Sequence, residues 1–277
     1  MNKIAFVFLL IIAFSSTVCC GGQGVTSSRA ECSKADSSVN IITDSIPAGA
    51  KALMSAYAEI VTGYRNDSLI FDDSSSIIFD DRKKKTFIEL LDHSDIEDMF
   101  SIPYDISQWI PKQFQDAGRV RCESLFRKIY GNSRKDVESH LVTVQWFGQK
   151  LRFTSVCGAD DSLKAVACEF ESKPELHKYL KNASTYYWRK VRGADRLSAH
   201  SYGIAIDINT SFSDYWLWAS PGKGEMAEIK YKNRIPHEIV NVFERHGFIW
   251  GGRWYHFDTM HFEFRPELHI VEQLRIK

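Results

Sequence analysis

The stretch RLSAHSYGIAIDIN (residues 196–209) has the most informative pattern in the sequence. Over residues 203–208 small and large residues alternate, which is typical of a β-strand with Asp207 on a face of small residues and isoleucines on the other face. A carboxylate inside so apolar a strand costs free energy unless it is paired or bound to a metal. His200 lies just before the strand, where a loop can fold its imidazole back toward Asp207. We therefore predict that this stretch forms one half of a metal site.

A second stretch, GGRWYHFDTMHFEF (residues 251–264), supplies the other half. Its last four residues alternate like a strand that begins at His261, and Asp258 lies three residues earlier. Two imidazoles and one carboxylate form the usual protein ligand set of a catalytic zinc site, with water in the fourth position. Zinc makes that water more acidic, so a neighbouring carboxylate can take its proton. We predict that His200, Asp207 and His261 hold one Zn²⁺ and that Asp258 is the base.

These two stretches resemble the signatures of a known enzyme family. SAHSYGIAID (residues 198–207) is similar to the SxHxxGxAxD signature of the D-alanyl-D-alanine carboxypeptidase and L-alanyl-D-glutamate endopeptidase family, which includes vancomycin-resistance carboxypeptidases. DTMHFE (residues 258–263) is similar to the second signature of these zinc metallopeptidases. The resemblance covers about residues 186–268, with looser similarity back to about residue 45. It implies the same zinc ligands and the same base.

The resemblance also implies a fold and a substrate-binding arginine. The fold is α+β, of the hedgehog/D,D-peptidase type: an antiparallel sheet with flanking helices, plus a smaller N-terminal α+β region. The family commonly uses an arginine upstream of the first signature to contact substrate, and we assign this role to Arg189 of WRKVRGADRLSAH (residues 188–200). Arg192 and Arg196 lie in the same range, and a packing role for the arginine stays an open alternative. Arg196 is expected to contact substrate or to fix the loop that carries His200.

Three further side chains near the second signature receive roles. His256 and Trp254 are candidates for the substrate-binding wall, and packing is the alternative interpretation for both. Glu263 lies two residues after His261, so on a strand it should point the same way and support that ligand.

Outside the two signatures, hydrophobic spacing predicts a series of short elements. We expect helices or helical turns over residues 51–64, 87–91, 96–100, 114–130 and 175–180, and strands over residues 68–71, 77–79, 141–147 and 149–155. We divide the chain into a secretory signal (1–20), a flexible tether (21–44), an N-terminal α+β region (45–135) and a zinc peptidase catalytic domain (136–277).

Charge and the N-terminus restrict the partners and the location. Lysine plus arginine and aspartate plus glutamate each number 35, which excludes the basic footprint of a nucleic-acid binder. Lys3, the apolar run over residues 4–14 and the small residues after it are typical of a secretory signal, so we expect export to the periplasm, to the outer membrane as a lipoprotein, or to the medium. Cys19 and Cys20 leave lipid attachment to a membrane and free secretion both open. We expect a monomer.

The remaining cysteines are Cys32, Cys122, Cys157 and Cys168. An even number in an exported chain permits disulfides, and four cysteines allow three pairings. Because Cys157 and Cys168 flank the acidic segment 158–161, which we interpret as a turn, we predict a disulfide between them.

Two classes of function follow. The favoured one is a secreted zinc-dependent peptidase that hydrolyses peptidoglycan stem peptides, either as a D,D-carboxypeptidase or as an L-alanyl-D-glutamate-type endopeptidase. The alternative is a zinc-containing, non-catalytic binding module of the same fold. Asp258 favours the enzyme, because a binding module has no need of a base beside its metal. A hydrolase that acts on a substrate outside the cell wall is a third interpretation.

Overall fold

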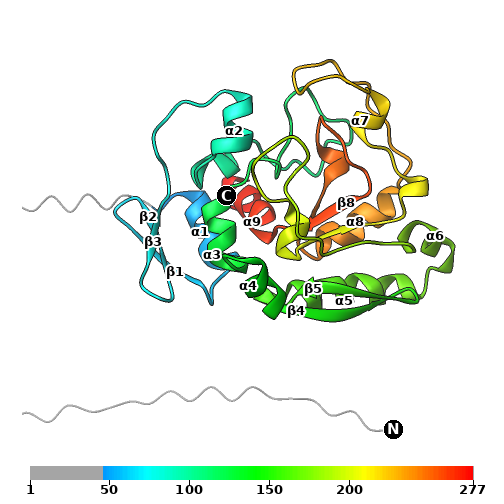
Figure 1. Cartoon of the computed structure of the whole chain (residues 1–277), viewed down its shortest axis with the longest axis horizontal. Helices are drawn as coiled ribbons and strands as arrows, with labels where there is room; N and C mark the ends of the chain where they lie inside the picture. The colour runs from blue at the N-terminus through cyan, green and yellow to red at the C-terminus, as the bar shows by residue number, and fades with distance from the viewer. Residues whose placement is uncertain (1–45, 277) are drawn as a thin grey trace, which may run out of the picture. The chain divides into compact units, whose positions relative to one another are not determined.

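The strands form three small antiparallel sheets in this computed structural model, which describes residues 46–276 (Figure 1). One sheet has the order β6-β8-β7, with β8 in the middle; a second has the order β1-β2-β3, and the third is the β4–β5 hairpin. Their bounds are β1 (Val61–Arg65), β2 (Ser68–Phe71), β3 (Ser76–Ile78), β4 (Leu141–Trp146), β5 (Gln149–Thr154), β6 (Ala205–Asp207), β7 (Phe248–Trp250) and β8 (His261–Phe264).

Helices surround these sheets, so the expected α+β class is confirmed. They are α1 (Ala48–Ala56), α2 (Phe87–His93), α3 (Glu123–Tyr130), α4 (Arg134–Ser139), α5 (Ala159–Glu171), α6 (His177–Leu180), α7 (Trp216–Ala219), α8 (His237–Arg245) and α9 (Pro266–Ile276). Helix α5 packs along the β4–β5 hairpin, α8 packs against β7, and α1 packs against α9 (Figure 1). No helix within residues 46–276 is long and apolar enough to cross a membrane.

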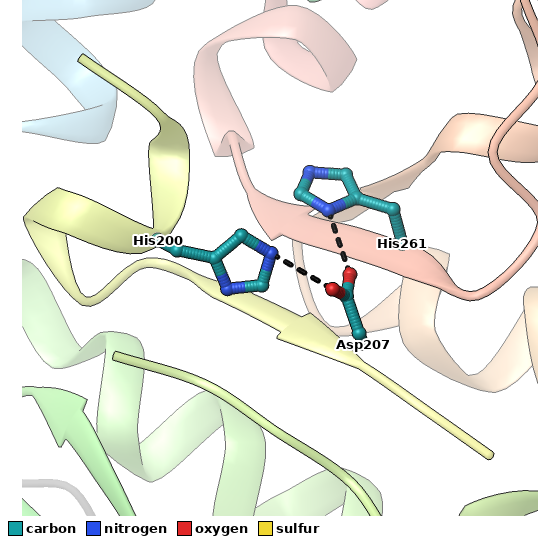
Figure 2. A group of neighbouring side chains, drawn as sticks. All are labelled: His200, Asp207 and His261. Carbon is teal, nitrogen blue, oxygen red and sulfur yellow. Dashed lines mark hydrogen bonds and ion pairs between the residues drawn. The ribbon is translucent and has the colours of Figure 1, made fainter. Parts of the chain in front are cut away.

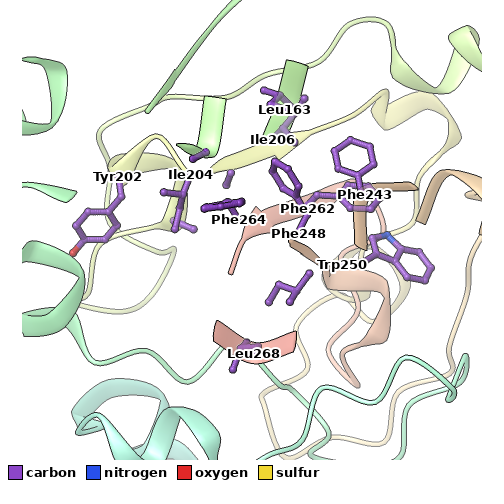
Figure 3. Close-up of a cluster of buried hydrophobic side chains, with 14 of the residues drawn as sticks. Leu163, Tyr202, Ile204, Ile206, Phe243, Phe248, Trp250, Phe262, Phe264 and Leu268 are labelled. Carbon is purple, nitrogen blue, oxygen red and sulfur yellow. The ribbon is translucent and has the colours of Figure 1, made fainter. Parts of the chain in front are cut away.

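The β6-β8-β7 sheet fixes the register of both signatures. In the β6–β8 pair, Asp207 lies opposite His261. Aromatic packing under the sheet holds this register: the ring of Phe262 on β8 stacks on Phe243 of α8, with ring centroids 4.0 Å apart, and Ile206 is buried in the same cluster (Figure 3). Burying each such side chain contributes roughly 1.5–3 kcal/mol. A slip of one residue would turn these apolar side chains out of the core, so packing also determines which side chains meet across the strands.

The first part of the described chain joins this core through α1. Tyr57, at the end of α1, is buried and its hydroxyl donates a hydrogen bond to Glu267 of α9 at 2.6 Å. Residues 46–276 accordingly form one compact unit.

Two predicted helices are shorter than expected. The helix predicted over 51–64 is α1, which ends at Ala56, because the chain from Val61 onward pairs with β2 instead. The helix expected within residues 114–130 is α3, which begins at Glu123 and ends before Gly131 as expected. The backbone of Phe114 and Gly118 has positive φ, which interrupts a helix.

The predicted disulfide between Cys157 and Cys168 is wrong. Both are free cysteines, because the segment interpreted as a turn is the start of α5. Asp160 and Asp161 lie in the first helical turn, where acidic side chains interact favourably with the helix dipole. A rise of about 1.5 Å per residue puts Cys168 roughly 14 Å along the helix, whereas a disulfide requires Cα atoms within about 7 Å. The signal, the tether, Cys19, Cys20 and Cys32 lie outside the described residues.

Candidate active site

The three predicted zinc ligands come together at one end of the β6-β8-β7 sheet, where β6 ends and β8 begins. His200 lies in a short 3₁₀ turn (Ala199–Tyr202), Asp207 ends β6 and His261 begins β8. The Asp207 carboxylate lies between the two rings, with Oδ2 3.2 Å from His200 Nε2 and Oδ1 3.0 Å from His261 Nδ1 (Figure 2). The chain therefore converges three donor atoms on one point.

Gly203 makes the local part of this arrangement possible. It ends the turn after His200 with φ +70°, a left-handed conformation that glycine adopts without a steric penalty. A Cβ at this position would lie 2.4 Å from the Leu141 side chain. Gly203 of the first signature therefore lets the chain turn between His200 and Asp207. Its lack of a side chain also leaves room for Leu141 of the β4–β5 hairpin.

Hydrogen bonds on the far side of each ring fix which nitrogen faces the carboxylate. His200 Nδ1 lies 2.6 Å from the carbonyl oxygen of Thr185, which only accepts, so Nδ1 carries the proton. His261 Nε2 lies 3.2 Å from the Glu263 carboxylate. This leaves Nε2 of His200 and Nδ1 of His261 directed toward Asp207, which is the usual way in which ligating histidines are oriented.

The electrostatics of the three residues suit a cation. Burial raises the pKa of Asp207, but the adjacent His200 and His261 outweigh this and hold it well below its ordinary value. Burial lowers the pKa of His261, and hydrogen bonds to Asp207 and Glu263 reverse this and raise it to about 10. Donor atoms of the three residues all lie within 4.8 Å of one another. Two imidazoles and a carboxylate that converge in this way fit the ligand set of a catalytic zinc site.

Asp258 faces the same space. It lies in the loop before β8, its Oδ1 is buried, and this atom has no hydrogen-bond partner within the described chain. Burial and the negative charge of Asp207 raise the pKa of Asp258 to about 7. A cation held by the three ligands would oppose this rise. An unpartnered carboxylate oxygen beside the ligand set is where a reacting water would need an acceptor.

The three predicted ligands and Asp258 line one pocket with a volume of about 170 Å³. The residues predicted to contact substrate line it too: Arg189, Arg196, Trp254 and His256, together with the alternative Arg192. The Trp254 ring lies beside His261, with centroids 5.5 Å apart. Arg189 is exposed, and within residues 46–276 its guanidinium has no hydrogen bond or ion pair.

His256 is held too firmly on both sides to be a free substrate contact. It is buried, its Nδ1 lies 2.8 Å from Asp116, and its Nε2 lies 2.8 Å from the backbone oxygen of Glu225. Burial raises the pKa of Asp116, and Arg119 and His256 outweigh this and lower it. His256 therefore builds the pocket wall through its neighbours, in line with the packing alternative.

Two arginines of this pocket were not predicted. Arg119 and Arg121 come from the irregular segment before α3. Arg119 donates twice to Glu225, at 2.9 and 2.8 Å. Arg196 donates to the backbone oxygen of Arg119, and its buried Nε has no hydrogen-bond partner within the described residues. Burial and the adjacent guanidinium groups of Arg121 and Arg119 lower the pKa of Arg196 to about 9.

Comparison with known proteins agrees with this geometry. Residues 192–264 match the family model described as D-alanyl-D-alanine carboxypeptidase. The resemblance expected from the two signatures is thereby confirmed over the matched segment, which contains all three ligands and Asp258. Arg119, Arg121 and Arg189 lie before it. No curated protein and no solved structure shows a significant match to the chain.

Proposed function

We propose that this protein is an exported zinc-dependent peptidase that hydrolyses the stem peptides of peptidoglycan. The match to a D-alanyl-D-alanine carboxypeptidase family supports the peptidase class, and the converging His200, Asp207 and His261 support zinc as the metal. We propose a hedgehog/D,D-peptidase-type fold for the part that carries these residues. Action as a monomer and export, either with a membrane anchor at Cys19 or Cys20 or by free secretion, belong to the same proposal.

The observation that carries the proposal is the position of Asp258. Its buried Oδ1 lacks a hydrogen-bond partner within residues 46–276 and lies on the wall of the pocket that the three ligands line. A buried carboxylate without compensation costs free energy, so a purely structural site would gain stability by losing it. A base needs just this placement, within reach of a water at the ligand set. This favours an enzyme over a non-catalytic binding module.

Each of several pocket residues has a separate role in the proposed hydrolysis of the peptide bond. Zinc, when bound, would polarise the scissile carbonyl and make a neighbouring water more acidic. Asp258 takes the proton from the attacking water at Oδ1 and returns it to the leaving amine. Arg189, whose guanidinium is exposed at the pocket, stabilises the negative charge that develops on the carbonyl oxygen. Trp254, packed beside His261, limits the water around the reacting bond.

The charge of the pocket suits the proposed substrate class. Five arginines line it, and the stem peptides of peptidoglycan carry free carboxylates. Arg196 belongs to this set. Its Nη1 donates to the backbone oxygen of Arg119 and its buried Nε lies 3.6 Å from Asp92, so it would attract a substrate carboxylate through its charge.

Digestion of purified peptidoglycan tests the proposal. Soluble muropeptides are analysed by mass spectrometry after incubation with the zinc-loaded protein, with the protein stripped by a chelator, and with the stripped protein given zinc again. We expect stem peptides shortened by terminal D-alanine, or cut between L-alanine and D-glutamate, in the first and third samples only. Zinc-loaded protein that binds peptidoglycan and leaves every stem intact would support the binding module instead.

A further inference from the structure

Glu263 stands out among the buried charges outside the ligand set. It lies on β8, is completely buried, and contacts three groups that donate hydrogen bonds. Its Oε1 accepts from Arg265 Nη1 at 3.0 Å. Its Oε2 lies 3.2 Å from Arg121 Nη1 and 3.2 Å from His261 Nε2. One carboxylate thus joins a metal ligand, a pocket arginine and a core arginine.

The contacts of Glu263 continue through the core to the first helix. Arg265 also donates through Nε to Glu267, and Glu267 accepts the 2.6 Å hydrogen bond from the Tyr57 hydroxyl at the end of α1. All of these side chains are buried. A row of alternating charges therefore runs from α1 to His261, and its members other than Glu263 and His261 lie outside the segment that matches the peptidase family.

The chemistry of a carboxylate determines the state of the His261 ring. An ionised carboxylate only accepts hydrogen bonds, so the ring nitrogen that faces it must carry a proton. Nε2 of His261 faces Glu263, and Nδ1 faces Asp207. Asp207 is itself a predicted ligand, so a metal ion would take the place of the proton between Asp207 and Nδ1. Glu263 lies outside the ligand set and keeps the proton on Nε2, which leaves Nδ1 as the donor atom.

The two carboxylate oxygens of Glu263 have different partners, which shows that this side chain does more than pair with a charge in the core. Arg265 already neutralises Glu263 through Oε1. Oε2 is left for His261 and for Arg121, which lines the pocket. A carboxylate needed only to pair with Arg265 would have no reason to present its second oxygen to a ligand of the site.

We propose that Glu263 is a positioning residue, which holds His261 with Nδ1 toward the metal and is itself held by Arg121 and Arg265. The inference rests on the zinc site proposed above. It adds that Arg121, which comes from the segment before α3 and lies outside the matched segment, helps to maintain the geometry of a ligand.

The ring proton of His261 is the first test. In zinc-loaded wild-type protein labelled with ¹⁵N, correlation spectra of the histidine rings should show a slowly exchanging proton on Nε2 of His261 and one on Nδ1 of His200. A proton on Nδ1 of His261, with zinc on Nε2, would overturn the inference without any variant being made. A wild-type protein that takes up no zinc would instead overturn the proposed function.

Zinc affinity is the second test, measured by competition with a chromophoric chelator. In Glu263→Gln the side chain keeps its shape, but its amide nitrogen replaces one accepting oxygen and turns a donor either toward Arg265 or toward Arg121 and His261. We expect zinc to bind about 10- to 100-fold more weakly, the usual loss when the partner of a ligating histidine is removed. Tyr57→Phe is the matched control: it cuts the far end of the row, so the melting temperature should fall while zinc affinity stays within about twofold of the wild type. Equal zinc affinity of a folded Glu263→Gln variant and the wild type would show that Glu263 serves only the core.

Discussion

Replacing Asp258 by asparagine separates catalysis from metal binding. The change removes a negative charge and a proton acceptor and keeps the shape of the side chain. The three ligands are untouched, so the variant should bind one zinc per chain as the wild type does. Its turnover on peptidoglycan stem peptides should fall by about 10²–10⁴, which is the usual contribution of a positioned acid–base group.

The same variant should be more stable than the wild type when both are free of metal. A pKa raised from 3.8 to about 7 corresponds to a destabilisation of roughly 4 kcal/mol once Asp258 is ionised in the folded protein. The buried amide of the asparagine still lacks a full set of partners, which costs about 1–3 kcal/mol. The net gain in the free energy of unfolding is therefore about 1–3 kcal/mol at pH 8.

The sign of this effect depends on pH. A carboxyl whose folded pKa is raised is protonated in both states below its unfolded pKa of about 3.9, so it carries no penalty there. The penalty grows as the pH rises from about 4 to about 7 and is complete above that value. The stability advantage of Asp258→Asn in metal-free protein should therefore be present at pH 8 and absent at pH 4.

Three measurements on the two proteins decide the matter: zinc content, turnover, and denaturant unfolding of the stripped forms at both pH values. An Asp258→Asn variant that is folded, zinc-loaded and nearly as active as the wild type would refute the role of Asp258 as the base. A stability difference between variant and wild type that is the same at pH 4 and pH 8 would refute the reasoning on its burial.

Three further predictions concern other parts of the chain. Gly203→Ala should lower the free energy of unfolding by about 1–3 kcal/mol in thermal or denaturant unfolding, because φ is +70° and the new Cβ would meet Leu141; wild-type stability would contradict this. Arg189→Ala should reduce kcat by about 10²-fold in a stem-peptide assay at unchanged zinc content, and an unchanged kcat would assign Arg189 to the surface. Cys157 and Cys168 should both react with a thiol reagent in unfolded, unreduced protein, since α5 separates them, and a linked peptide pair in mass mapping would contradict the structure.

The part of the site that is formed by residues close together in the chain, His200 and Asp207, was predicted well from the sequence. His200 and Asp207 lie close together in the chain, and Gly203 and the alternation after it carry the turn and the strand that join them. His261, by contrast, lies 54 residues after Asp207, and its place in the set came from the second signature. In the structure, β6 pairs with β8 so that Asp207 lies opposite His261. The packing of Phe262 on Phe243 favours this register.

The other half of the pocket could not be read from the sequence. Arg121 reaches Glu263 across 142 positions of the chain, and Arg119 reaches Glu225 across 106. No motif surrounds these arginines, since their segment is irregular and is placed by tertiary packing. The error at α5 has a local cause: Asp160 and Asp161 after a glycine are common in turns, and the same residues suit the first turn of a helix.

Elemental analysis of zinc in the purified protein and in its His261→Ala variant tests the central claim most directly. We expect one tightly bound zinc per wild-type chain and almost none in the variant, because the loss of one of three protein ligands removes the site. A circular dichroism spectrum of the variant shows whether it is folded. Undiminished zinc in folded His261→Ala would contradict the assignment of His200, Asp207 and His261 as the metal centre.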